Sequence, residues 1–190
     1  MAFEIKGRAF TATMRLLDRA PGGRGSVLVR LPEADRSFFD ELFLESGWYA
    51  MEPYVRLMQF LAKSRGQSLR AWMCHQAELT ASNDAEGIYR RSLESASPRE
   101  MAKRLPRAFN RYFRPPHAEL AELGEDFADF ELSAIPVAME DFFRGVNDGF
   151  VMGALKYAGA PDPKVVYRDS RRGARHAGYD TVVLPFRAEF

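Results

Sequence analysis

The segment from Gly149 to Phe186 constrains the fold of this chain most strongly. It begins with a stretch rich in small residues, continues into Pro161-Asp162-Pro163, and ends in two short segments, 164–168 and 181–186, joined by an arginine-rich loop. This order predicts a long helix over 137–157, followed by an antiparallel pair of strands. A helix that runs directly into a hairpin indicates a mixed α+β domain.

The residues before this segment are mostly helical in pattern. Apolar spacing predicts helices over about 8–19, 32–44, 51–63, 67–79, 85–93 and 97–114, and residues 26–31 suit either a strand or a short helix. The helix near 97 has a specific start signal, because Ser97-Pro98-Arg99-Glu100 is a capping box with proline at the first helical position. Apolar residues interleaved with acidic ones from 117 to 135 predict a hairpin.

These elements together predict a mainly helical α+β domain with a small antiparallel sheet formed by the C-terminal half. We expect residues 1–190 to form one domain, with the helical part over about 8–114 and a hairpin, a helix and a second hairpin over about 117–188. A chain of 190 residues is long enough to bury a substantial core.

Composition indicates a cytoplasmic protein. Cys74 is the single cysteine, which excludes an internal disulfide and fits a reducing compartment. The N-terminus has no apolar run of the kind found in signal peptides. No stretch reaches the roughly 18 apolar residues that a membrane span needs.

The charge is segregated along the chain although the net charge is only +1. Residues 97–114 carry six basic side chains against Glu100, whereas 118–148 carry nine acidic side chains against Arg144, and 164–176 are basic again. These surfaces can neutralise one another within the fold, or the basic ones can dock an acidic partner. A net charge near zero and the absence of a recognition motif disfavour nucleic acid.

Side chains that could carry chemistry do not cluster in the sequence. His75, His117 and His176 lie far apart and form no metal-ligand spacing, which disfavours a metal site. Cys74 adjoins His75, but neighbouring residues on a helix point about 100° apart, so we favour a structural cysteine over a nucleophile. A thiol that lines an internal pocket is the alternative. Without a paired acid and base or a phosphate loop, we expect no enzyme activity.

Three glycines recur at intervals of four in the predicted long helix, namely Gly145, Gly149 and Gly153. Glycine destabilises a helix interior by about 1 kcal/mol relative to alanine, so something is expected to approach this backbone closely. A tightly packed helix or strand is one interpretation. A ligand lying along the groove is the other, with Phe142, Val146 and Phe150 as walls.

Several short motifs resemble an uncharacterised bacterial group, the myxobacterial paralogous family. They are Gly47-Trp48-Tyr49, the Ser97-Pro98 helix that ends in Arg111-Tyr112-Phe113, the Gly149–Leu155 helix and the Gly178-Tyr179 hairpin. That family is in turn similar to the ligand-binding fold of vinyl-reductase-type sensory domains, TRAPP subunits and haem nitric-oxide sensors. The resemblance implies a domain that binds a small molecule or lipid in a helix-lined pocket, or that acts as an interaction module or dimer, without catalysis.

Two departures from these groups bear on cofactors. The final hairpin has no cysteine, so a thiolate metal site there is ruled out. Haem sensors of this superfamily hold the propionates with Tyr-x-Ser-x-Arg, whereas this chain reads Tyr167-Arg168-Asp169-Ser170-Arg171, with an anion where the serine is needed. We therefore expect no cofactor and no metal.

The leading hypothesis is a non-enzymatic cytoplasmic sensory or adaptor domain that binds a small apolar ligand in a helix-lined pocket and signals to a protein partner. The candidate ligand-binding residues are large or soft side chains on core helices: Trp48, Tyr54, Met58, Trp72, Cys74 and Phe150. The alternative is a ligand-free interaction or homodimerisation module. It would use Arg104, Arg107 and Arg111 of the basic 97–114 helix, or Arg171 and Arg172 of the arginine-rich 168–175 hairpin.

Overall fold

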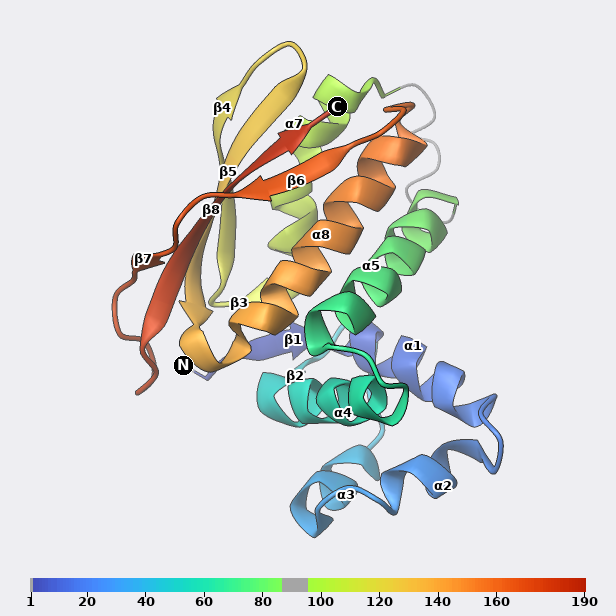
Figure 1. The fold of residues 1–190 in the computed structure, drawn as a ribbon. Coiled ribbons are helices and arrows are strands. Elements are labelled where there is room, and N and C mark those ends of the chain that lie inside the picture. The colour runs from blue at the N-terminus through green and yellow to red at the C-terminus, as the bar shows by residue number, and fades with distance from the viewer. Residues whose placement is uncertain (1, 87–95) are drawn as a thin grey trace.

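The computed structural model describes residues 2–86 and 96–190. The first half is mostly helical (Figure 1). In chain order it contains β1 (Glu4–Lys6), α1 (Gly7–Asp18), α2 (Gly23–Leu28), α3 (Glu33–Phe39), β2 (Trp48–Ala50), α4 (Met51–Ser64) and α5 (Leu69–Glu86).

The second half alternates strands with two long helices. It contains α7 (Pro98–Phe109), β3 (Phe113–Arg114), β4 (His117–Leu123), β5 (Phe127–Pro136), the 3-10 turn η1 (Val137–Met139), α8 (Glu140–Tyr157), β6 (Lys164–Tyr167), β7 (Arg171–Arg172) and β8 (Thr181–Glu189). The predicted α+β class is confirmed, as are the hairpin and the helix-to-hairpin ending.

A five-stranded antiparallel sheet forms the centre of the second half. Its order is β4-β5-β8-β6, and β7 also pairs with β8. Phe130 of β5 lies opposite Phe186 of β8, and their rings stack with centroids 5.0 Å apart. The register of this pair shifts between Leu132 and Ile135, where Ala134 adopts a positive φ of 55°. This bulge bends β5 at the end that leads into α8.

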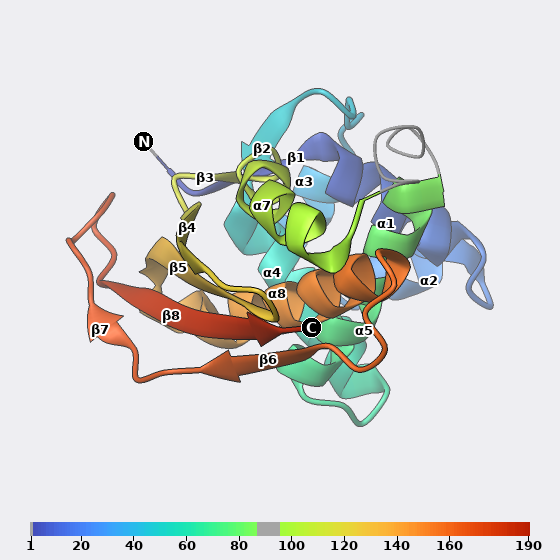
Figure 2. The same ribbon diagram turned by 90° about the horizontal axis from the view of Figure 1, so that it is seen from above.

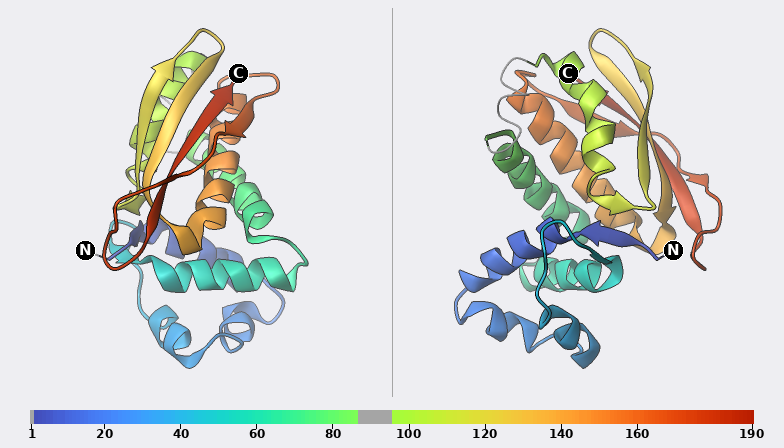
Figure 3. Two further views of the ribbon diagram at one scale, coloured as in Figure 1. Left: turned by 60° about the vertical axis from the view of Figure 1, so that its left-hand side comes forward. Right: turned by 180° about the vertical axis from the view of Figure 1, so that it is seen from behind.

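The helices pack against one face of this sheet in layers. Figures 1 and 2 show α8 between the sheet and α5, with α7 beside α8 along β4. Figure 3 shows α1 to α4 below this layer, beyond the ends of α5 and α8. The N-cap of α7 matches the predicted capping box, because the Ser97 hydroxyl accepts a hydrogen bond from the Glu100 amide at 3.3 Å.

A second, smaller sheet was not predicted, and it corrects the expectation that all strands lie in the C-terminal half. Its order is β2-β1-β3, and it joins the N-terminus to the residues after α7. The helix predicted over 51–63 begins at Met51 as expected, and the preceding Trp48–Ala50 forms a strand that pairs with β1. The Trp48 ring lies under Lys6 Nζ at 4.3 Å and Arg114 Cζ at 3.8 Å.

Several predicted boundaries were also wrong. The helix expected over 32–44 ends at Phe39, because the chain turns so that Phe43 stacks on Phe10 with centroids 4.5 Å apart. The helix expected over 97–114 ends at Phe109, since Phe113 pairs with β1. Residues 23–28 are helical, which resolves the ambiguity over 26–31. The piece expected over 85–93 lies outside the described residues, apart from the last two positions of α5.

A hydrophobic core runs from the N-terminal helices to the sheet. Phe3, Phe10, Phe142, Phe143 and Leu184 are completely buried members of it. In the described parts of the chain, no helix combines the length and apolar character needed to cross a bilayer.

Candidate functional site

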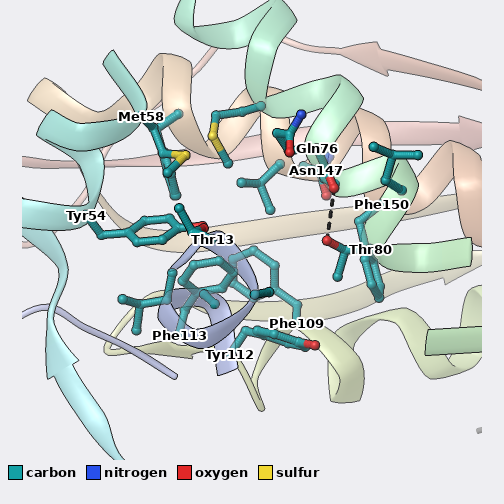
Figure 4. A pocket seen from close by; sticks show the side chains of 18 of the residues that line it. Thr13, Tyr54, Met58, Gln76, Thr80, Phe109, Tyr112, Phe113, Asn147 and Phe150 are labelled. Carbon is teal, nitrogen blue, oxygen red and sulfur yellow. Dashed lines mark hydrogen bonds between the residues drawn. The ribbon is translucent and has the colours of Figure 1, made fainter. Parts of the chain in front are cut away.

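A cavity of about 480 Å³ lies between the helices and the inner face of the large sheet. Its wall is built by α1, α4, α5, α7 and α8 together with β4, β5 and β8. Figure 4 shows Tyr54 and Met58 of α4 reaching in from one side and Phe150 of α8 from the other. The volume is within the range of about 300–1,000 Å³ that is usual for small-molecule sites.

The sheet and α7 supply a wall without polar side chains. Strand alternation turns Phe130 and Leu132 of β5 inward, and Phe186 of β8 lies beside them. From α7 come Leu105, Pro106 and Phe109, the turn after it contributes Tyr112 with its hydroxyl, and β3 contributes Phe113. The sheet and α7 themselves offer no side-chain hydrogen bond, so this part of the wall favours apolar matter.

Polar groups on the helical side are few and mostly have partners within the protein. The Thr13 and Tyr54 hydroxyls lie 3.2 Å apart. The Thr80 hydroxyl donates a hydrogen bond to the Gln76 carbonyl at 2.9 Å, which Figure 4 draws as a dashed line. The Asn147 amide donates to the Tyr167 hydroxyl at 3.0 Å. Burial raises the pKa of Tyr54 above its ordinary value, so this phenol stays protonated at neutral pH.

Trp72 is the exception among these polar groups. The residue is 4% exposed, and its indole Nε1 is buried without an acceptor within the described chain. A buried donor of this kind is costly unless a water or a ligand atom accepts its hydrogen bond.

The charged side chains in the described part of the cavity wall are all basic. Within the described residues, the ionisable lining groups with a formal charge are Arg8 and Arg15 of α1 and Arg19, which follows the last residue of that helix. They lie by the exposed apolar side chains of Leu16 and Leu79, which also line the cavity, so the mouth opens between α1 and α5. The mouth is therefore basic at its rim and apolar inside.

The structure brings together four of the six predicted ligand-binding residues. Tyr54, Met58, Trp72 and Phe150 all line the cavity. Trp48 lies away from the wall, in the small sheet between Lys6 and Arg114. Cys74 also lies off the wall, on the side of α5 that faces α8.

The surroundings of Cys74 are those of an unreactive thiol. Burial raises the pKa of Cys74 above its ordinary value, and the nearby carboxylates of Asp148 and Glu78 raise it further. The neighbouring glycines of α8 also have a structural explanation. A Cβ on Gly149 would lie 1.9 Å from the Cys74 carbonyl oxygen, so the close approach along this helix is that of α5. The ligand groove considered for these glycines is occupied by helix backbone.

Residues that the sequence did not single out form much of the wall. On α1, Ala9, Ala12 and Thr13 face the cavity and leave space beside the larger Ile5. Small residues at helical spacing on an otherwise amphipathic helix were the available signal. No sequence pattern indicated that the sheet lines a cavity, because Phe130 and Leu132 have the inward-facing pattern of ordinary core residues.

The predicted partner-binding arginines lie on two separate surfaces. Arg104, Arg107 and Arg111 are exposed on the outer side of α7 and the turn that follows it. Arg171 and Arg172 are exposed on β7, at the other end of the sheet in Figures 1 and 3, and Arg171 forms an ion pair with Glu131. The two sets do not form one patch.

Solved structures with a similar fold include several H-NOX proteins. An H-NOX protein from K. algicida superposes with a TM-score of 0.67 at 13% identity, covering 98% of each chain. One from S. oneidensis in the Fe(II)NO ligation state gives 0.63 at 13%, covering 98% of this chain and all of the other. A structure from work on heme distortion in the H-NOX family gives 0.69 at 12%, covering 98% and 95%. These identities show a shared fold. By sequence, the chain matches no family model and no curated protein.

The residues of the cavity do not fit a haem. Among the described residues, no histidine lines it: His75 and His117 are exposed, and His176 contacts Phe3 in the loop between β7 and β8. The orphaned indole of Trp72 is a donor and cannot bind iron. The segment Tyr167–Arg171 also lies outside the wall, and the Tyr167 hydroxyl is used by Asn147 and the Arg144 carbonyl. No group of three or more metal-ligating side chains occurs in the described chain.

Proposed function

We propose that this chain binds a small apolar molecule, without haem, in the cavity between its helices and its sheet. The observation that carries the proposal is a cavity of about 480 Å³, open at one mouth, whose sheet and α7 walls are apolar. Its H-NOX-like fold supports the proposal, because one solved neighbour comes from work on heme distortion and another is in an Fe(II)NO ligation state. The absence of a histidine from the wall formed by the described residues directs it toward an organic ligand.

The domain acts as a sensor or adaptor in this proposal and not as an enzyme. The cavity wall holds side chains from α1, α4, α5, α7, α8 and the sheet, so an occupant contacts elements that are far apart in the sequence. Its binding would restrict the relative motion of these elements, and a partner that contacts their outer faces could detect the change. The resemblance to the myxobacterial paralogous family, which implies a ligand-binding domain without catalysis, remains a prediction and forms part of this proposal.

A ligand-free interaction or homodimerisation module is the second candidate. It is favoured by the outer face of α7, where Lys103, Arg104 and Arg107 are exposed while Met101 and Leu105 on the opposite side are buried. Replacing Arg104 and Arg107 with glutamate tests it. The change should abolish capture of an acidic partner or dissociate a homodimer, and it should leave ligand binding in the cavity unchanged.

Native mass spectrometry of protein purified from its own host tests the leading proposal. We expect a bound organic molecule that is released on denaturation, together with the mass of the subunit or dimer. Ala77→Leu should displace it, because Ala77 lines the cavity, whereas Ala71→Leu on the exposed face of the same helix should retain it. An empty wild-type protein whose melting temperature does not respond to apolar compounds would refute the proposal.

A further inference from the structure

The rim of the cavity restricts the chemistry of its occupant. Arg8 and Arg15 of α1 and Arg19 at its C-terminal end line the cavity, and no acidic side chain lines it within the described residues. Arg15 and Arg19 are exposed, next to the exposed Leu16 of the same wall. A molecule that fills the cavity from this mouth leaves its outermost group beside guanidinium groups.

We propose that the ligand is a single-chain anionic amphiphile, with its apolar chain in the cavity and its carboxylate or phosphate head between Arg15 and Arg19. This inference rests on the proposed function and specifies the ligand class for the same cavity. The guanidinium fork pairs with the two oxygens of either head group in a bidentate manner. A cationic head group would meet like charge at the same place.

The present partner of Arg15 does not prevent this arrangement. Arg15 forms an ion pair with Glu45 at 3.2 Å, and both side chains are more than half exposed. Exposed pairs of this kind contribute little to stability, so Arg15 can exchange Glu45 for a ligand head group. Glu45 lies in the loop before β2 and is not part of the cavity wall.

The cavity offers an apolar surface for the alkyl chain of the ligand. Ala12 and Leu79 are exposed apolar residues of the wall, and the buried part of the wall includes Phe109 and, on the sheet, Leu132 and Phe186. These side chains offer no hydrogen bond, so a second polar group deep in the ligand would be unfavourable against the sheet. Among the described lining residues, the orphaned donor Trp72 Nε1 is on the α5 side of the wall.

Calorimetric titration with four dodecyl compounds below their micellar concentrations tests the inference. The compounds are dodecanoic acid, dodecyl phosphate, dodecan-1-ol and dodecylamine, which share one chain and differ in the head group. We expect the acid or the phosphate to bind at least roughly threefold more tightly than the alcohol, and the amine to bind most weakly. The ranking of acid against phosphate identifies which anionic head the rim prefers.

The double variant Arg15→Gln/Arg19→Gln should remove this preference. We expect its affinity for the preferred anion to fall roughly two- to tenfold while its affinity for dodecan-1-ol is unchanged. The control Arg107→Gln/Arg172→Gln removes the same charge from exposed positions outside the cavity, and it should leave both affinities unchanged.

The outcomes separate this inference from the proposed function. Alcohol and anion binding equally well to the wild-type protein would overturn the anionic head group and leave apolar ligand binding intact. Equal losses in the rim variant and the control would overturn the role of Arg15 and Arg19. If no compound binds to folded protein, the inference fails, and the proposed function then depends on the native mass measurement.

Discussion

At the scale of single residues, Cys74 shows how local surroundings set reactivity. Its pKa is raised by burial and by the carboxylates of Asp148 and Glu78, so less thiolate is present at neutral pH than in a free cysteine. We expect iodoacetamide at pH 7.5 to alkylate the folded protein at least about tenfold more slowly than glutathione. In guanidinium chloride the difference should disappear. A folded-state rate equal to that of glutathione would contradict this account.

The sequence could predict some cavity residues because large or soft side chains on core helices have few other places to go. Tyr54, Met58, Trp72 and Phe150 reach the cavity in this way. Trp48 could not be distinguished from them, because its position depends on a strand pairing with β1 that no local pattern indicates. Arg15 and Arg19 could not be selected from the other arginines, since the rim exists only once α1 and α5 are placed together.

At the scale of elements, the glycines of α8 determine how closely α5 can pack. Gly149→Ala would place a Cβ 1.9 Å from the Cys74 carbonyl oxygen, which is fixed in the α5 backbone. We expect a loss of about 1–3 kcal/mol in the free energy of unfolding, measured with urea. Gly25→Ala in α2 is the control, because nothing lies within 4 Å of its Cβ position, and it should be neutral or slightly stabilising. Equal effects of the two changes would refute the packing explanation.

Elements with a local cause were predictable, and those that depend on distant pairing were not. The capping box at Ser97 places the start of α7 correctly, because its hydrogen bond lies within one turn. The hairpin of β4 and β5 follows from alternation in the same way. The small sheet joins residues 4–6 to residues 48–50 and 113–114, so its register is a property of the tertiary structure.

At the scale of the whole molecule, one buried carboxylate links three strands of the large sheet. Asp129 of β5 bonds with Arg187 of β8 at 2.8 Å and with Arg168, just after β6, at 2.7 Å. The hydrogen bond from Arg187 and the charge of Arg168 hold the pKa of Asp129 below its ordinary value. The stability that this carboxylate contributes is therefore present at neutral pH. It is lost as the pH falls below the unfolded-state pKa of about 3.9.

Replacing Asp129 tests this linkage. We expect Asp129→Asn to reduce the free energy of unfolding at pH 7 by about 1–3 kcal/mol and to flatten the loss of stability toward pH 3. Asp162→Asn is the matched control, because its side chain is 83% exposed and its pair with Lys164 is long at 3.4 Å. An unchanged pH dependence in Asp129→Asn would show that another group governs the acid response.

The positions of the two tryptophans allow intrinsic fluorescence to detect a ligand in the cavity. Trp72 borders the cavity with a buried indole, whereas Trp48 is held between Lys6 and Arg114 in the small sheet. An occupant changes the polarity around the first ring and leaves the second unchanged. The variant Trp48→Phe would therefore emit from one fluorophore at the cavity wall. Its emission wavelength would report occupancy in real time, without a label.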